Sequence, residues 1–156
     1  MKTYIEQLNN DVINQEWMRE MVELWNINAI ETADCELDES DREAIHEQLK
    51  EYITSKYGMV VVAMNEHQQI IGYSIASVKK DLVSGELSGQ LDEVYVAPEY
   101  RGKKLAKKLV DNVIKWLDQQ NISLIHVHVD IDNKLALKFW EKNGFDIEFF
   151  TLSNNE

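Results

Sequence analysis

The N-terminal half of the chain combines helical and extended patterns of apolar residues. Residues 4–8 predict a first strand, which residues 9–11 end. From Asp11 to about Ala29, apolar residues recur every three or four positions and predict a helix. Ser40-Asp41-Arg42-Glu43 has the form of a capping box and predicts the start of a second helix, which Gly58 ends. The apolar face of this second helix consists of Ile45, Leu49, Tyr52 and Ile53.

Three strands are predicted in the middle of the chain. Residues 59–64 form a continuous apolar run, which is typical of a strand buried on both faces. A polar turn at 65–69 leads to the alternating residues 71–75, which predict a second strand and a hairpin. Residues 79–89 predict a loop, and residues 91–96 predict the third strand of the group.

A helix and two further elements follow the stop at residues 97–100. The helix ends at Asn121, and a strand at 122–129 comes next. A strand–helix–strand unit requires a crossover, so the strands at 91–96 and 122–129 are expected to be parallel. The helix buries one stripe, formed by Leu105, Leu109, Val113 and Leu117.

The C-terminal residues complete the predicted topology. Asp132 predicts the N-cap of a short helix over 133–142, Asn143-Gly144 ends it, and residues 145–152 predict a last strand. The order β-α-α-β-β-β-α-β-α-β predicts an α/β fold with a mixed central sheet. We expect one domain over residues 1–156, because no repeat, linker or compositional break divides the chain.

Composition excludes several classes of protein. An apolar fraction of 44% is too high for a disordered chain, and the single Cys35 provides neither a disulfide framework nor a cysteine zinc site. No apolar run reaches the length of a membrane span and no signal peptide is visible, so we expect a cytoplasmic protein without membrane contact. The net charge of −12 at pH 7 argues against nucleic acid as a partner.

The segment Arg101–Lys108 departs from this acidic character, with five basic residues in eight. The prediction places them in the first turns of a helix, where the helix dipole repels cations. A bound anion removes the conflict, because free N–H groups, dipole and basic side chains would all face it. Gly102 would let the backbone approach a phosphate closely. The alternative is an amphipathic helix with a solvated face, which suits Lys107 and Lys108.

Two motifs resemble those of the GNAT superfamily of acetyl-CoA-dependent N-acetyltransferases. Val94-Tyr95-Val96-Ala97-Pro98 leads into Arg101-Gly102-Lys103-Lys104-Leu105-Ala106, which is similar to the family pattern R/Q-x-x-G-x-G/A. Lys104 stands where the inner glycine is usual. Asn133 to Phe145 is similar to the family segment N-x-x-A-x-x-F-Y-x-K-x-G-F. Both motifs occur in the family order, and the predicted elements match the family over nearly the whole chain.

The resemblance implies a GNAT-like sheet in which two central parallel strands splay apart. Acetyl-CoA would pair its pantetheine arm with the strand edge at 94–96 and place its pyrophosphate on the amides of 101–106. Phe139 could equally be a core aromatic. No metal is expected, although His126, His128 and Asp130 share a predicted strand face. The implied coenzyme-binding residues are Val94, Tyr95, Val96, Arg101, Gly102, Lys103, Lys104, Leu105, Ala106, Asn133, Ala136, Phe139, Trp140 and Lys142.

Glu93 is the candidate catalytic residue. An ammonium has no lone pair, so direct attack on the thioester in a ternary complex requires a base. Glu93 would serve as this base, or would instead bind a cationic substrate or form a salt bridge. Alternation places Asp92 on the opposite face unless a bulge resets the register. Trp140 occupies the position of the usual tyrosine acid and leaves that role vacant.

The acceptor is predicted to be a small cationic amine, similar to a polyamine or an aminoglycoside. Residues 34–43 contain six acids and would border the acceptor site, although acids at a helix start also complement its dipole. The alternatives are a protein or peptide amine and a non-catalytic acyl-CoA-binding module. The C-terminal sheet edge is expected to be either short or completed by a second copy in a homodimer.

Overall fold

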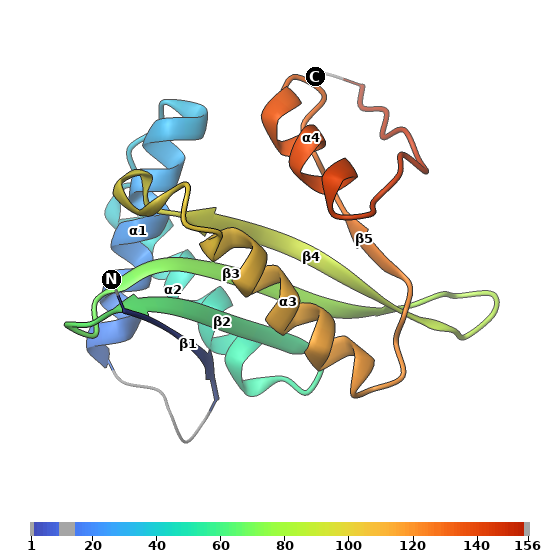
Figure 1. The fold of residues 1–156 in the computed structure, drawn as a ribbon, viewed down its shortest axis with the longest axis horizontal. Helices are drawn as coiled ribbons and strands as arrows, with labels where there is room; N and C mark the ends of the chain where they lie inside the picture. The colour runs from blue at the N-terminus through green and yellow to red at the C-terminus, as the bar shows by residue number, and fades with distance from the viewer. Residues whose placement is uncertain (1, 10–14, 155–156) are drawn as a thin grey trace.

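The computed structural model, which describes residues 2–9 and 15–154, contains one twisted mixed sheet with helices on both faces (Figure 1). Neighbouring strands are antiparallel, except that β4 and β5 are parallel. This arrangement confirms the predicted α/β class and the crossover. In the described residues the strand order is β1 (Thr3–Leu8), β2 (Gly58–Asn65), β3 (Ile70–Lys80), β4 (Leu87–Val96) and β5 (Ile125–Val127).

The sheet separates the core into two layers, and two helices cover each of them. On one face of the sheet lie α1 (Gln15–Ala33) and α2 (Glu39–Thr54), and on the other lie α3 (Leu105–Asp118) and α4 (Lys134–Lys142). The residues of β2 alternate between the two layers, so its continuous apolar run is buried on both sides as predicted. Each fully buried valine contributes roughly 1.5–3 kcal/mol. None of the helices in the described ranges is long and apolar enough to cross a membrane.

The starts and ends of α1 and α2 differ from the prediction. The expected start of the first helix at Asp11 lies outside the described residues, and α1 continues to Ala33 instead of ending near Ala29. The capping box predicted at 40–43 is wrong. Asp38 caps α2, because its carboxylate accepts from the Asp41 backbone N–H while Asp41 accepts from that of Asp38. The motif is therefore shifted by two residues and built from two acids.

Other element ends also move once backbone pairing is formed. The helix predicted to end at Gly58 ends at Thr54, and Gly58 opens β2. The predicted loop at 79–89 shrinks to residues 81–86, because Lys79 and Lys80 continue the ladder opposite Ser88 and Leu87. Asp81 closes this turn by accepting from the backbone N–H groups of Val83 and Ser84. The cap of α4 is Asn133, not Asp132, because its side chain accepts from the Ala136 N–H.

The C-terminal part of the sheet is smaller than predicted. β5 covers only Ile125–Val127 instead of 122–129, and the strand predicted at 145–152 does not form among the described residues. Phe150 and Leu152 are exposed there. A strand needs a neighbour for its hydrogen bonds, and β5 provides a ladder of three residues. The segment instead rests on β5 through side chains, with Glu148 at 3.3 Å from His126.

The parallel pairing of β4 and β5 ends early, and this positions the site. It joins residues 89–91 to residues 125–127, after which the two strands diverge. The predicted splaying of the central parallel strands is thus present. Residues 98–100 form a short 3-10 helix, η1 (Pro98–Tyr100), between β4 and the loop that leads to α3.

Gly89 sets how closely β4 passes beneath α3. A β-carbon at this position would lie 2.4 Å from Leu117 Cδ1, and Leu117 is fully buried. Gly89→Ala is therefore expected to lower the free energy of unfolding by about 2 kcal/mol, measured by urea denaturation. The neighbouring Ser88→Ala, on the half-buried side of the strand, should change it by less than about 0.5 kcal/mol. Equal effects of the two substitutions would contradict the close contact.

Candidate active site

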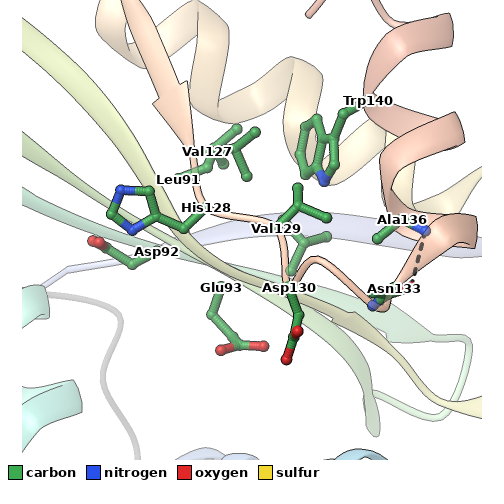
Figure 2. Close-up of a pocket in the computed structure, with 11 residues that line it drawn as sticks. Leu91, Asp92, Glu93, Val127, His128, Val129, Asp130, Asn133, Ala136 and Trp140 are labelled. Atoms are coloured by element: carbon green, nitrogen blue, oxygen red, sulfur yellow. Dashed lines mark hydrogen bonds between the residues drawn. The ribbon is translucent and has the colours of Figure 1, made fainter. Parts of the chain in front are cut away.

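A cavity of about 180 Å³ opens where β4 and the chain after β5 diverge (Figure 2). One wall is formed by residues 91–94 of β4, and the other by residues 127–130. Ala136 and Trp140 of α4 and Asn133, the N-cap of this helix, also line the cavity. The structure thus brings Glu93 and Val94 together with three of the predicted coenzyme residues from a distant part of the chain.

A β-bulge at Asp92 determines which side chains face this cavity. Ile75 pairs with Glu93 and Ala76 pairs with Leu91, so Asp92 is the extra residue. Its carboxylate accepts hydrogen bonds from the Tyr52 hydroxyl of α2 at 3.0 Å and the Ser77 hydroxyl at 2.7 Å. Asp92 therefore lies on the same side of the sheet as Glu93, not on the opposite side as simple alternation predicts. The bulge is the exception that the alternation rule allows.

The environment of Glu93 suits a base. Burial raises the pKa of its carboxyl group above the usual value, and the neighbouring Asp92 carboxylate raises it further. A hydrogen bond from the Asn28 side chain acts in the opposite direction and lowers this pKa. A carboxylate with a raised pKa accepts a proton more readily at neutral pH, which is what deprotonation of an amine requires. Figure 2 shows the carboxylates of Glu93 and Asp130 directed away from Trp140.

Asn28 reaches Glu93 from α1, and it is a site residue that the motifs do not reveal. Its Nδ2 atom donates to Glu93 Oε1 at 3.2 Å and to the Tyr73 hydroxyl oxygen at 3.0 Å. One signal was available in the sequence, because Asn28 lies seven residues after the buried Met21 and thus in phase with the apolar stripe. A buried asparagine in such a stripe needs a polar partner, and Glu93 is one.

The segment predicted to bind phosphate lies mostly in a loop rather than in the first turns of a helix. α3 begins at Leu105, so only Lys107 and Lys108 of the basic cluster are helical, which corrects the prediction. Lys107 pairs with Asp111 at 3.0 Å, as expected for a solvated helix face. Lys104 takes the N-cap position in the left-handed region, with φ 62°. This is the conformation glycine prefers, so the departure from the family pattern retains glycine's backbone geometry.

The N-terminus of α3 fits an anionic group such as the pyrophosphate of coenzyme A. Lys104 makes no side-chain capping hydrogen bond within the described residues. The first backbone N–H groups of the helix can therefore donate to another acceptor. Gly102 has φ 79° and open space where a β-carbon would stand. A close approach of phosphate oxygens to the loop backbone is therefore sterically allowed.

Arg101 uses its side chain to connect this loop to α1. Its Nη1 atom donates to Glu31 at 3.0 Å, its Nε atom donates to the Val96 carbonyl at 3.0 Å, and its guanidinium lies 5.3 Å from the Tyr95 ring centre. The hydrogen bond from Arg101 lowers the pKa of the Glu31 carboxyl group. A contact of the Arg101 side chain with coenzyme A would compete with this ion pair. The conformation of the Arg101 backbone is set by the loop and does not depend on the ion pair.

Three further predicted residues, Phe139, Trp140 and Lys142, lie on α4. Phe139 packs against the core beside Trp140, with ring centres 4.9 Å apart. These contacts are the ones expected of a core aromatic residue. Trp140 is buried and contacts Phe145 edge-on. Lys142 is exposed at the end of α4, outside the cavity. Among the described residues, no three His, Cys, Asp or Glu side chains are grouped as metal ligands, and this includes His126, His128 and Asp130.

The acidic segment between α1 and α2 is exposed. Asp38 and Asp41 cap α2, which agrees with the alternative that these acids stabilise the start of a helix. The Leu37 N–H donates to the buried Asn26 side chain at 2.8 Å and fixes the segment to α1. Cys35 is an exposed free thiol.

Comparison with known proteins assigns the chain to a family. A model described as acetyltransferase (GNAT) family matches residues 15–145. The chain belongs to this family of acetyl-CoA-dependent enzymes.

Among curated relatives, aminoglycoside N(6')-acetyltransferase type 1 of Acinetobacter baumannii is 27% identical over 109 residues, which cover 67% of the chain and 75% of that protein. Mycothiol acetyltransferase of Renibacterium salmoninarum is 29% identical over 85 residues, or 54% of the chain. The match spans only 25% of the mycothiol enzyme.

Solved structures share the fold over nearly the whole chain. The aminoglycoside 6'-N-acetyltransferase AAC(6')-Ih from Acinetobacter baumannii aligns with a TM-score of 0.76 and 20% identity, covering 99% of this chain and 98% of that one. A putative acetyl transferase from Pyrococcus furiosus aligns with a TM-score of 0.77 and 18% identity, covering 99% and 100%. At these identities the likeness establishes the fold.

Lys104 provides a test of the loop geometry. Lys104→Gly relieves the left-handed strain and is expected to raise the free energy of unfolding by about 0.5 kcal/mol in urea denaturation. Lys103→Gly removes the same charge at a residue without positive φ, and should lower the free energy by a similar amount. The same sign for both substitutions would contradict the strained cap.

Glu93 should reduce stability at neutral pH. Its raised pKa in the folded state means that ionisation destabilises the fold, and this cost disappears as the pH falls through the folded pKa. Glu93→Gln is therefore expected to raise the Tm at about pH 7.5, with a smaller difference from wild type at about pH 4.5. The exposed Glu99→Gln serves as control and should leave the Tm unchanged. A Tm gain for Glu93→Gln that persists at the lower pH would contradict the burial effect.

Proposed function

We propose that this chain transfers the acetyl group of acetyl-CoA to the primary amine of a small cationic acceptor. The observation that carries the proposal is the Glu93 carboxylate, whose raised pKa and position in the cavity between the diverging strands suit a base. Glu93 takes the proton from the acceptor ammonium directly or through a water molecule. The neutral amine then attacks the acetyl carbonyl in a ternary complex, so that the C–N bond forms, the C–S bond breaks, and the proton that the nitrogen still loses passes to the leaving thiolate directly or through water.

Acetyl-CoA supplies an activated thioester when it is bound. The residues of this chain that would hold it are the β4 edge at 94–96, the backbone of 101–106 and the α4 residues that line the cavity. A backbone N–H near Val94 would donate to the acetyl oxygen as negative charge develops there. Trp140 is buried and gives the cavity part of its wall through its indole ring. Its indole N–H is a poor acid, so the thiolate leaves without a proton from this position.

A cationic acceptor is supported by the charges around the cavity. Asp92, Glu93 and Asp130 all line it, and Asp92 is held in place by two hydroxyl donors. Carboxylates at these positions attract an amine that carries further positive charges. The relatives named aminoglycoside N(6')-acetyltransferases point to the same chemical class. A lysine-containing peptide is the alternative acceptor.

The test is thiol release from acetyl-CoA across a panel of polyamines, aminoglycosides and lysine peptides. We expect small polyamines or aminoglycosides to accelerate release, and Glu93→Gln to lower kcat by about 100-fold at neutral pH. The loss should shrink as the pH rises, because free amine becomes abundant. The control is Glu99→Gln, which should retain wild-type kcat.

The outcomes separate the competing functions. Tight binding of acetyl-CoA without acceleration by any amine would show a non-catalytic acyl-CoA-binding module and overturn the proposal. Acceleration by peptides alone would assign a protein acceptor. A loss in Glu93→Gln that does not depend on pH would contradict its role as a base.

A further inference from the structure

Asn28 is buried on α1 and places its side-chain amide between two oxygen atoms of the sheet. Only 7% of the surface of Asn28 is exposed to solvent. Its Nδ2 atom donates to the Tyr73 hydroxyl oxygen at 3.0 Å and to Glu93 Oε1 at 3.2 Å, and both N–H bonds of the amide therefore have an acceptor. A buried amide is stable only with such partners, so its orientation is closely defined.

The partner on β3 is rigid. Tyr73 is fully buried, and its ring stacks on Trp25 of α1 with ring centres 5.2 Å apart and an angle of 4° between the planes. The Asn28 amide oxygen lies on the other side, 3.4 Å from the Thr32 hydroxyl, which donates mainly to the Asn28 carbonyl. These contacts direct the nitrogen of the amide, and not its oxygen, toward the carboxylate.

We propose that Asn28 is a positioning residue for Glu93, which it orients within the cavity and stabilises as a carboxylate. The inference rests on the proposed function, in which Glu93 is the base. Asn28 does not contact the cavity itself and is not among its lining residues. It acts through Glu93 alone, from a helix that carries no residue of either sequence motif.

The charges around Glu93 determine the sign of the effect. Without Asn28, burial and the Asp92 charge act unopposed and the pKa of Glu93 rises. An aspartate at position 28 would add a second negative charge and raise it further. The other titratable groups near Glu93 stay the same in each variant: Asp92 and Tyr95 on β4, Tyr73 on β3, Tyr52 on α2, and His128 and Asp130 across the cavity.

The experiment compares Asn28→Leu and Asn28→Asp with matched substitutions of Asn26. Asn26 is equally buried on α1, at 8% exposure, but its side chain bonds the Leu37 N–H and does not reach Glu93. The readouts are KM for acetyl-CoA, kcat, and the acidic limb of kcat/KM for one fixed amine across pH. Ionisation of the amine contributes equally to every profile, so differences between variants report on Glu93.

Both Asn28 variants are expected to lower kcat about tenfold at neutral pH, with KM for acetyl-CoA changed less than about twofold. The acidic limb should move to higher pH, further in Asn28→Asp than in Asn28→Leu. The Asn26 variants should lower the Tm without moving the limb. An unchanged limb in folded Asn28 variants, or an equal movement in the Asn26 variants, would overturn the proposal.

A second measurement does not depend on acetyl transfer. Carbon-13 NMR of the labelled glutamate carboxyl groups, with the Glu93 signal identified by its loss in Glu93→Gln, follows the titration of Glu93 directly. A higher midpoint in Asn28→Leu supports the positioning role even where no amine is acetylated and the proposed function fails. An unchanged midpoint overturns it. Tyr73→Phe, which removes only the hydroxyl, should give a smaller change in the same direction and replaces any Asn28 variant that does not fold.

Discussion

The short parallel pairing of β4 with β5 is the constraint on which the rest of the site depends. The ladder joins only residues 89–91 to residues 125–127, and the strands separate directly after it. The bulge at Asp92 lies at the same point of β4, on its other edge against β3. Bulges bend the strand that carries them, so the bulge and the separation are parts of one distortion. This distortion opens the cavity and brings two acidic side chains to one side of the sheet.

α1 connects the two halves of the site through three polar contacts in its C-terminal part. Asn28 bonds Glu93, Glu31 bonds Arg101 in the loop before α3, and Asn26 bonds the segment that leads to α2. These groups come from residues far apart in the chain, and a rigid helix fixes them relative to one another. The side proposed for the acceptor and the side predicted to bind the coenzyme therefore share one support, although α1 contains no residue of the family motifs.

The sequence predicted those elements whose burial or motif can be recognised from the order of residues alone. Residues 59–64 were recognisable as a central strand because a run of apolar residues suits a strand buried on both faces, and residues 94–106 carried the family motif. The strand predicted at 145–152 does not form among the described residues, because alternation describes only the side chains and not the neighbour that must bond the backbone. The predicted N-cap of α2 was wrong for a similar reason. Asp38 and Ser40 are both suitable cap residues, and tertiary packing determines which of them caps the helix.

The charge distribution also takes a different form in the structure. The sequence suggests that the cations of 101–108 attract the coenzyme phosphates directly, but Arg101 is neutralised by Glu31 and Lys107 by Asp111. The backbone of the loop is then a second feature that suits an anion, because Gly102 and Lys104 both have positive φ and, in the described part of the chain, Lys104 makes no side-chain capping hydrogen bond at the start of α3. Dipoles fixed by the fold bind an anion without attracting it over a long range. An acidic protein can thus hold a phosphorylated coenzyme while its remaining surface charge stays available to attract the cationic acceptor proposed for it.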